Sequence, residues 1–333
     1  MISRKLLAPV RSLGVALLMS VVMVANAGAA TTATGPGNGL RVEPVRKDIT
    51  INGGDKLTIP ITVTNITTAS ATFKGIVDDF APSSDESGTP RPLADNQFAT
   101  QHSLKRYVGD ISDFTLAAGG QKVVNVTITV PKGASAGGYF GLVRFASTST
   151  NSNTNRNVSL SGSVGTLILL TVPGNLVDQL SVASFDVRHK ETPSTFFTTN
   201  KNLNVVVRFQ NGGNVQEEPF GKILIRNRSG KILASYEIND TQPRGNVLPD
   251  SIRRFSVPIS KIGSFGEFKA EGNFGYGSTN QLITASTTFY VVPIALIIAF
   301  ILIVLLLLFL IFGLPRLIRA YNQYIITQAR RRR

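Results

Sequence analysis

The chain has 333 residues with no cysteine and no tryptophan, so it contains no disulfide framework, zinc–thiolate site or cysteine nucleophile. Its 34 basic and 20 acidic residues give a formal charge of +14, but three basic residues lie in the first 27 positions and six in the last 19, where there are no acidic ones. The part between keeps 25 basic and 20 acidic residues, and a net charge of +5 indicates no nucleic-acid-binding surface.

Residues 1–27 have the pattern of a secretory signal peptide. Basic residues precede an apolar run at 13–24, and small residues at 25–27 supply a cleavage site. Residues 28–38, rich in Thr and Gly, form a short linker. The signal predicts that the segment which follows is exported.

From residue 39 to residue 290 the pattern is one strand after another. Apolar and polar residues alternate with a period of two, and Asn-Gly-Gly or Ser-Gly turns separate several of the runs, which is typical of sandwiches and barrels. The sequence therefore predicts an all-β fold of two tandem Ig-like β-sandwiches. The predicted strands are 56–65, 123–130, 139–145, 164–172, 180–187, 202–209 and 221–227.

A boundary is predicted near Pro173-Gly174-Asn175, between one sandwich at 39–175 and a second at 176–290. Two long segments interrupt the strand pattern of the first sandwich. Ala81–Gln101 is a long excursion, and Ser147–Asn157 has the composition of a hairpin tip. Loops on a rigid scaffold often carry binding sites, although plain solvated insertions fit both segments as well.

Val291–Leu314 contains no charged or strongly polar side chain and is long enough to cross a bilayer as a helix. The tail, 315–333, is basic, and arginines collect on the cytoplasmic side of such a span. These features predict a single-pass membrane protein with its N-terminal domains outside and its C-terminus in the cytoplasm. Arg330–Arg333 would lie near anionic lipid headgroups, either as a lipid contact or only as a topology signal.

Two sequence segments resemble a known family. They are 39–65 (GLRVEPVRKDITINGGDKLTIPITVTN) and Val130-Pro131 followed by Gly137-Gly138-Tyr139-Phe140-Gly141. Together they resemble the peptidoglycan-binding domain of WxL-interacting proteins, which are envelope proteins of Gram-positive bacteria. The resemblance implies a signal peptide, a second β domain, one membrane span and a basic tail. It also implies binding to cell-wall glycan, although the chain lacks tryptophan and its second half does not match the family's host-binding domain.

The binding residues that this motif favours are Tyr139, Phe140 and Arg144. Because the chain has no tryptophan, aromatic contacts with a sugar would come from Tyr or Phe. Packing in the core is the alternative role for each of these side chains. Peptidoglycan binding is implied by the resemblance alone, and the residues themselves leave it open.

No chemistry-bearing motif indicates an enzyme. The only histidines, His102 and His189, lie in segments interpreted as loops, and no nucleophile elbow or phosphate-binding loop is present. Asp78-Asp79, Asp85-Glu86 and Asp95 could supply calcium ligands, but their spacing matches no known loop, and Glu217-Glu218 reads as a solvated turn. The sequence therefore predicts no catalytic residue, metal or cofactor.

Three functions remain open from the sequence. The first is a cell-surface binding or scaffold protein that engages cell-wall glycan or another envelope protein. The second is a chaperone-like assembly or secretion factor that acts by β-strand complementation and needs an unpaired strand edge. The third is a passive stalk.

Overall fold

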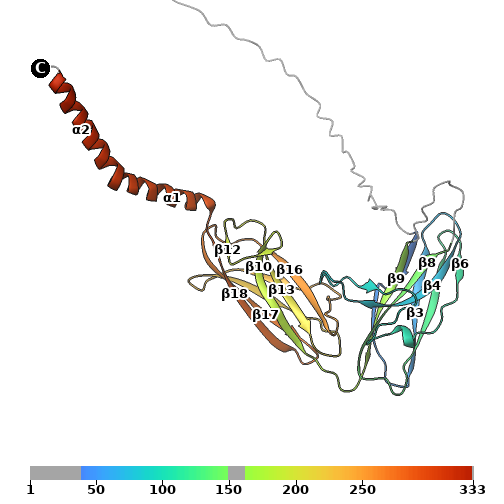
Figure 1. Ribbon diagram of the computed structural model, residues 1–333. Helices are drawn as coiled ribbons and strands as arrows, with labels where there is room; N and C mark the ends of the chain where they lie inside the picture. The colour runs from blue at the N-terminus through green and yellow to red at the C-terminus, as the bar shows by residue number, and fades with distance from the viewer. Residues whose placement is uncertain (1–38, 149–161, 332–333) are drawn as a thin grey trace, which may run out of the picture. The chain divides into compact units, whose positions relative to one another are not determined.

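The computed structural model describes residues 39–148 and 162–331 (Figure 1). Within these ranges the chain forms strands β1 to β18 and then one long helical segment. The strands make two β-sandwiches, so the predicted all-β fold with a C-terminal apolar helix is confirmed. The predicted signal peptide and linker, and most of the predicted hairpin tip at 147–157, lie outside the described residues.

The first sandwich packs a three-stranded sheet against a larger one. The smaller sheet has the order β1-β3-β7, with β1 (Leu40–Glu43), β3 (Lys56–Asn65) and β7 (Gln121–Thr129). The larger sheet has the order β2-β9-β8-β4-β5, and β6 also pairs with β4. Its strands are β2 (Arg46–Thr50), β4 (Ala71–Ala81), β5 (Arg91–Pro92), β6 (Phe114–Leu116), β8 (Gly137–Ser147) and β9 (Ser163–Val172), and a short helix, η1 (Lys105–Tyr107), precedes β6.

The second sandwich has two sheets of similar size. One has the order β11-β10-β13-β16, with β10 (Leu180–His189), β11 (Thr192–Pro193), β13 (Leu203–Asn211) and β16 (Ser251–Ile259). The other has the order β12-β18-β17-β14-β15, with β12 (Phe196–Phe197), β14 (Phe220–Asn227), β15 (Ile232–Ile238), β17 (Gly266–Tyr276) and β18 (Gln281–Val291). Each sandwich has its own cluster of buried apolar side chains.

Alternation in the sequence explains both cores. In β3, Ile59, Ile61 and Val63 are almost completely buried, while the residues between them face outward. Successive side chains on a strand point to opposite faces of the sheet, so such a pattern buries one face only. All seven predicted strands are confirmed, with ends that agree to within two residues.

A buried asparagine ends one long strand of each sandwich, β3 in the first and β13 in the second. Asn65 and Asn211 are both fully buried. The Asn65 amide donates to the carbonyl oxygens of Leu116 and Ala117 at 3.2 and 3.0 Å. Asn211 donates to Val215 and Val247 at 2.7 and 2.9 Å. Each amide thereby fixes a turn that would otherwise leave carbonyl groups unpaired in the interior.

The C-terminal helical segment begins at Ile294, because Val291 still belongs to β18. It consists of α1 (Ile294–Leu308), a π-helical turn η2 (Phe309–Gly313) and α2 (Leu314–Arg331). Residues 294–324 are long and apolar enough to cross a membrane. The helix continues through Pro315, because the preceding π-helical turn accommodates a residue that cannot donate a backbone hydrogen bond.

Candidate functional site

The last strand of the first sandwich, β9, has a partner on each side. It pairs antiparallel with β8, and β2 pairs with it in parallel, from Arg46 opposite Leu167 to Thr50 opposite Thr171. Two further backbone bonds extend this pairing: Leu167 N–H donates to Val45 at 2.9 Å and Ile51 N–H to Thr171 at 3.1 Å. A short parallel strand therefore covers this sheet edge from Leu167 to Thr171.

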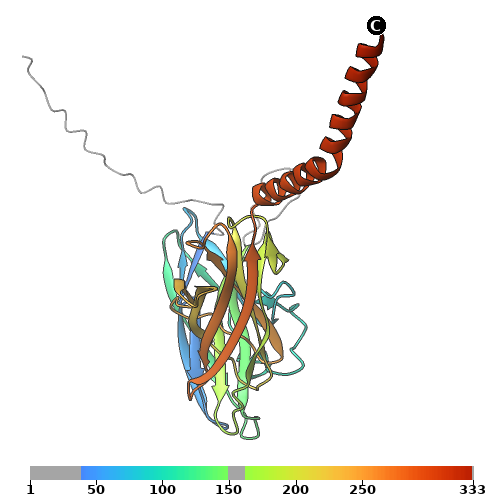
Figure 2. The ribbon, with the colours of Figure 1, turned by 90° about the vertical axis from the view of Figure 1, so that its left-hand side faces the viewer.

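The last strand of the second sandwich, β18, has an equivalent neighbour that is much shorter. β12 also pairs in parallel, but only Phe196 opposite Tyr290 and Phe197 opposite Val291. Along residues 281–289 no described strand pairs with the outer side of β18. Figure 2 shows this strand in orange-red, directly before the helix.

Two hydrogen bonds between β18 and the β12 segment show which backbone groups of β18 point away from β17. Tyr290 N–H donates to Thr195 and Val292 N–H to Phe197, both at 2.8 Å, so the even-numbered residues direct their N–H and C=O groups outward. The same set continues along the uncovered part of the strand. It comprises Leu282, Thr284, Ser286 and Thr288. An edge of this length is a template for an added strand, and Leu282 beside it is 72% exposed.

The other edges are shorter or partly covered. On β16, Arg254 N–H donates to Glu86 at 2.8 Å, and Pro258 has no N–H to offer. On β7, Gly109 N–H donates to Thr127 at 3.0 Å. Among the described strands, β18 therefore presents the longest uncovered edge.

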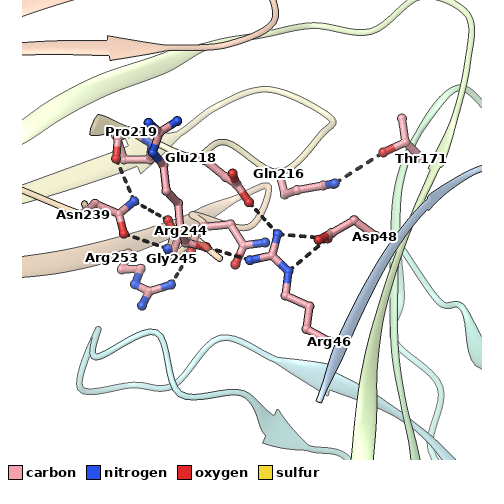
Figure 3. A network of polar contacts seen from close by, with 11 residues as sticks. Arg46, Asp48, Thr171, Gln216, Glu218, Pro219, Asn239, Arg244, Gly245 and Arg253 are labelled. Atoms are coloured by element: carbon pink, nitrogen blue, oxygen red, sulfur yellow. Dashed lines mark hydrogen bonds and ion pairs between the residues drawn. The ribbon is translucent and has the colours of Figure 1, made fainter. Parts of the chain in front are cut away.

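A polar joint connects the two sandwiches (Figure 3). Arg46 of β2 forms ion pairs with Asp48 at 2.9 Å and with Glu218 of the second sandwich at 2.5 Å. The same guanidinium donates to the Arg244 carbonyl oxygen at 2.7 Å. Asn239 in turn holds the loop that carries Arg244, since Gly245 N–H donates to its side-chain oxygen at 2.7 Å. Glu218, expected in a solvated turn, is therefore a contact between the sandwiches.

The excursion Ala81–Gln101 belongs to the same joint. Glu86 accepts a hydrogen bond from Arg208 of β13 at 2.7 Å, in addition to the Arg254 contact. The buried carboxylate of Asp79 accepts hydrogen bonds from the backbone N–H groups of Ala99 and Lys105, both at 2.9 Å. The end of the excursion is thus held at Asp79, and its middle is attached to the second sandwich through Glu86.

Glu217 is buried, although the sequence suggested a solvated turn. Its backbone exchanges hydrogen bonds with Val247, which places the side chain in the interior at 2% exposure. Its Oε1 atom has no hydrogen-bond partner among the described residues. Burial, together with the nearby charge of Asp178, raises the pKa of Glu217 to about 7.

The three residues favoured by the sequence motif do not come together as one site. Phe140 is 4% exposed and packs on Phe80, with ring centroids 6.2 Å apart. Arg144 pairs with the buried Asp78 at 2.6 Å and with Asp95 at 2.7 Å. Tyr139 lies on the opposite face of β8 from these two, because neighbouring positions on a strand alternate.

Tyr139 lines a hollow of about 440 Å³. Its ring lies 5.0 Å from that of Tyr107, and its hydroxyl donates to the Ser135 carbonyl oxygen at 2.9 Å. His102 contributes to the same wall and is half-buried, with Nδ1 2.6 Å from the Gly138 carbonyl oxygen. Burial and the contact with Tyr139 raise the pKa of Tyr107 to about 12, so this phenol stays protonated at neutral pH.

The acidic groups considered as calcium ligands have other partners. Asp85 accepts a hydrogen bond from the backbone N–H of Ser87 at 3.0 Å, Glu86 contacts Arg208, and Asp95 contacts Arg144. Within residues 39–148 and 162–331, no cluster of His, Cys, Asp or Glu side chains could hold a metal ion.

No motif in the sequence marks β18 as a site. Its inward residues Ile283, Ala285 and Phe289 alternate with Leu282 and Thr284, so periodicity could have found the strand. Whether the outer edge of β18 has a partner depends on how far β12 extends. The alternation of residues within β18 does not indicate this.

No family model matches the sequence, and neither does any curated protein. Solved structures with a similar fold include the class 5 fimbriae chaperone CfaA, at 13% identity over 76% of this chain and 99% of that one, with a TM-score of 0.39. The E. coli chaperone DraB is 13% identical over 75% and 96% of the two chains, with a TM-score of 0.31. A PapD-like domain of human CEP192 is 13% identical over 42% and 88%, with a TM-score of 0.29. At these identities and scores the likeness does not bear on function.

Proposed function

We propose that the protein is anchored in the membrane by its C-terminal helix and binds an extended segment of another envelope protein by strand addition to β18. The binding is chaperone-like or scaffold-like and involves no catalysis. The observation that carries this proposal is the uncovered outer edge at 281–289, on a strand whose counterpart in the first sandwich is covered over five residues. An added strand gains affinity from backbone hydrogen bonds and specificity from every second side chain.

The geometry also favours a direction for the partner. Both β2 and β12 run parallel to the last strand of their sandwich. A segment that continues the β12 position would run parallel to β18, towards the residue at which the helix begins. It would place alternate side chains near the exposed Leu282, where an apolar residue fits best.

The test uses the full chain in nanodiscs and overlapping peptides from envelope proteins of the source organism. Ser286→Pro removes one outward N–H without touching the ladder to β17, since an edge position tolerates proline. Ser286→Ala keeps the N–H and is the matched control. We expect peptides that bind the parent chain to bind Ser286→Pro at least about fivefold more weakly, the equivalent of roughly 1 kcal/mol for one hydrogen bond.

The amide exchange of β18 provides the second measurement. A bound peptide should slow hydrogen exchange at Leu282, Thr284, Ser286 and Thr288, all of which lie on the uncovered edge. Strand addition at β18 would be ruled out if binding peptides bound Ser286→Pro and the parent equally well and left these amides unprotected.

Binding to cell-wall glycan is a second candidate function, and one specific observation favours it: the hollow beside Tyr107 and Tyr139. Two tyrosine rings beside Arg106 and Gln101 offer the apolar faces and polar groups that a sugar can use. Sedimentation of the full chain in detergent micelles with insoluble cell wall tests this role. Tyr139→Ala should reduce saturable, salt-resistant pelleting, while Ser286→Pro should not. Pelleting that disappears at moderate salt would discard the glycan role.

A further inference from the structure

Three exposed aromatic side chains gather at the end of the second sandwich where the chain leaves for its helix. Phe196, Phe265 and Tyr290 are 52%, 61% and 42% exposed. Phe196 is opposite Tyr290 in the β12–β18 pairing, and Phe265 precedes Gly266, which is opposite Val291. Phe265 and Tyr290 also line one open hollow with Phe268 and Val292. Contiguous exposed apolar groups of this kind mark an interaction surface.

The distance from this surface to the membrane is limited by the chain itself. Strand β18 ends at Val291 and the helix begins at Ile294, so only two residues separate them. An extended connection of this length reaches about 10 Å at ~3.5 Å per residue. The apolar part of the helix, 294–314, is about 31 Å long at ~1.5 Å per residue and matches the ~30 Å hydrocarbon core. Ile294 therefore lies near the edge of that core, and the end of the sandwich reaches the headgroups.

The charges around the aromatic residues fit such a surface. The exposed basic residues at this end lie in the turns that adjoin the ends of β10, β13, β14, β15 and β16. They are Lys190, Lys201, Arg228, Lys231 and Lys261. The acidic residues there are Glu191, which pairs with Arg254 at 2.6 Å, and the half-buried Glu267. The excess is positive, as contact with anionic lipid requires.

We propose that this end of the second sandwich docks on the bilayer that its own helix spans. Phe196, Phe265 and Tyr290 lie in the headgroup region, as aromatic residues of membrane interfaces do, and the surrounding lysines and arginine face lipid phosphates. The docking rests on anchoring by the helix but not on strand addition at β18. Its consequence is that the open edge of β18 stands at a fixed height and orientation above the membrane.

Because the chain has no tryptophan, single substitutions report on this directly. The full chain is reconstituted in vesicles that contain phosphatidylglycerol and brominated phosphatidylcholine, with one of three replacements. Phe265→Trp probes the patch, Phe300→Trp probes the helix, and Leu282→Trp lies about 27 Å away at the other end of β18. All three positions are exposed, at 61%, 67% and 72%, so tryptophan fits without repacking the core.

We expect tryptophan at 265 to be quenched by bromine near the headgroups and to emit at shorter wavelength, and tryptophan at 282 to remain unquenched. Replacing Lys190, Arg228 and Lys261 by Gln should lower the equilibrium constant for docking on the order of a hundredfold, at ~1 kcal/mol per charge. Quenching at 300 but not at 265 would overturn the docking alone. A shifted but unquenched tryptophan at 265 would overturn the docking and assign the patch to contact with a second copy of the chain. No quenching at 300 would overturn the anchoring and the docking together.

Discussion

The two sandwiches place a short parallel strand in the same position, and they differ in how far it extends. In the first sandwich β2 covers five residues of the last strand, whereas in the second β12 covers two. Edge strands are normally covered or blocked because they invite pairing with other chains. The comparison therefore separates a sandwich whose last strand is half covered by the chain itself from one that leaves a longer edge open to a strand from a partner.

The largest expected effect concerns whether the two sandwiches are independent units. Phe209 of the second core and Phe145 of the first are both fully buried, and Phe209 contacts Phe274 at a centroid distance of 5.0 Å. Each change to alanine should lower the free energy of unfolding of its own sandwich by about 3–5 kcal/mol. Hydrogen exchange in urea, read for each sandwich separately, measures this. Equal effects of Phe209→Ala on both sandwiches would mean that the joint makes them unfold as one.

A second difference lies in how buried carboxylates are paired. In the first sandwich Asp79 accepts two backbone hydrogen bonds, whereas Oε1 of Glu217 in the second finds no hydrogen-bond partner in the part of the chain that the structure describes. The pKa of Glu217 is raised to about 7 in the folded state from about 4.5 in the unfolded one. The unfolded chain therefore releases this proton at lower pH, and stability falls as the pH rises from about 4.5 to 7, by up to ~3 kcal/mol.

Glu217→Gln removes that titration. The variant should be more stable than the parent at pH 8 by up to ~3 kcal/mol and about equal to it at pH 4. Denaturant unfolding across this range measures the difference, with the exposed Glu237→Gln as a control. A constant difference between Glu217→Gln and the parent at all pH values would contradict the raised pKa.

Proline substitutions compare the covered edge of β9 with the uncovered edge of β18. Lys47 of β2 lies in the stretch paired with β9, and by alternation from the Val45 and Ile51 bonds its N–H faces that strand. Lys47→Pro should therefore destabilise the first sandwich by about 2 kcal/mol. Ser286→Pro on the open edge of β18 should cost less than ~1 kcal/mol. Urea midpoints give both values, and a large loss for Ser286→Pro would show that its N–H already has a partner.

The smallest expected effect concerns the joint. Arg46 is 12% exposed and Glu218 37%, so their ion pair is partly screened by solvent. A double-mutant cycle with Arg46→Met and Glu218→Gln should give a coupling free energy of about 1 kcal/mol. A coupling near zero would mean that Arg46 acts through Asp48 and the Arg244 carbonyl oxygen and not through Glu218.

The strands predicted with nearly correct boundaries include β3, which alternates strongly, and β9, which is apolar on both faces. Weakly alternating strands were missed. In β17 the glycines at 266, 272 and 275 and charged residues interrupt the apolar positions, yet Phe268, Ala270 and Phe274 fill the core. At the candidate sites, the motif led to the hollow beside Tyr139. It did not reveal that Phe140 and Arg144 lie on the other face and have partners within the fold.

By itself the sequence determined the all-β class, the apolar C-terminal helix and the turns between the main strands. These follow from period-two alternation, hydropathy and local backbone preferences, which act between neighbours in the chain. Only the tertiary structure decided that Glu86 and Glu218 join the sandwiches, that Glu217 is buried and that β18 has an uncovered edge. Each of these depends on residues far apart in the sequence, because ion pairs, burial and strand partners are set by how the elements pack together.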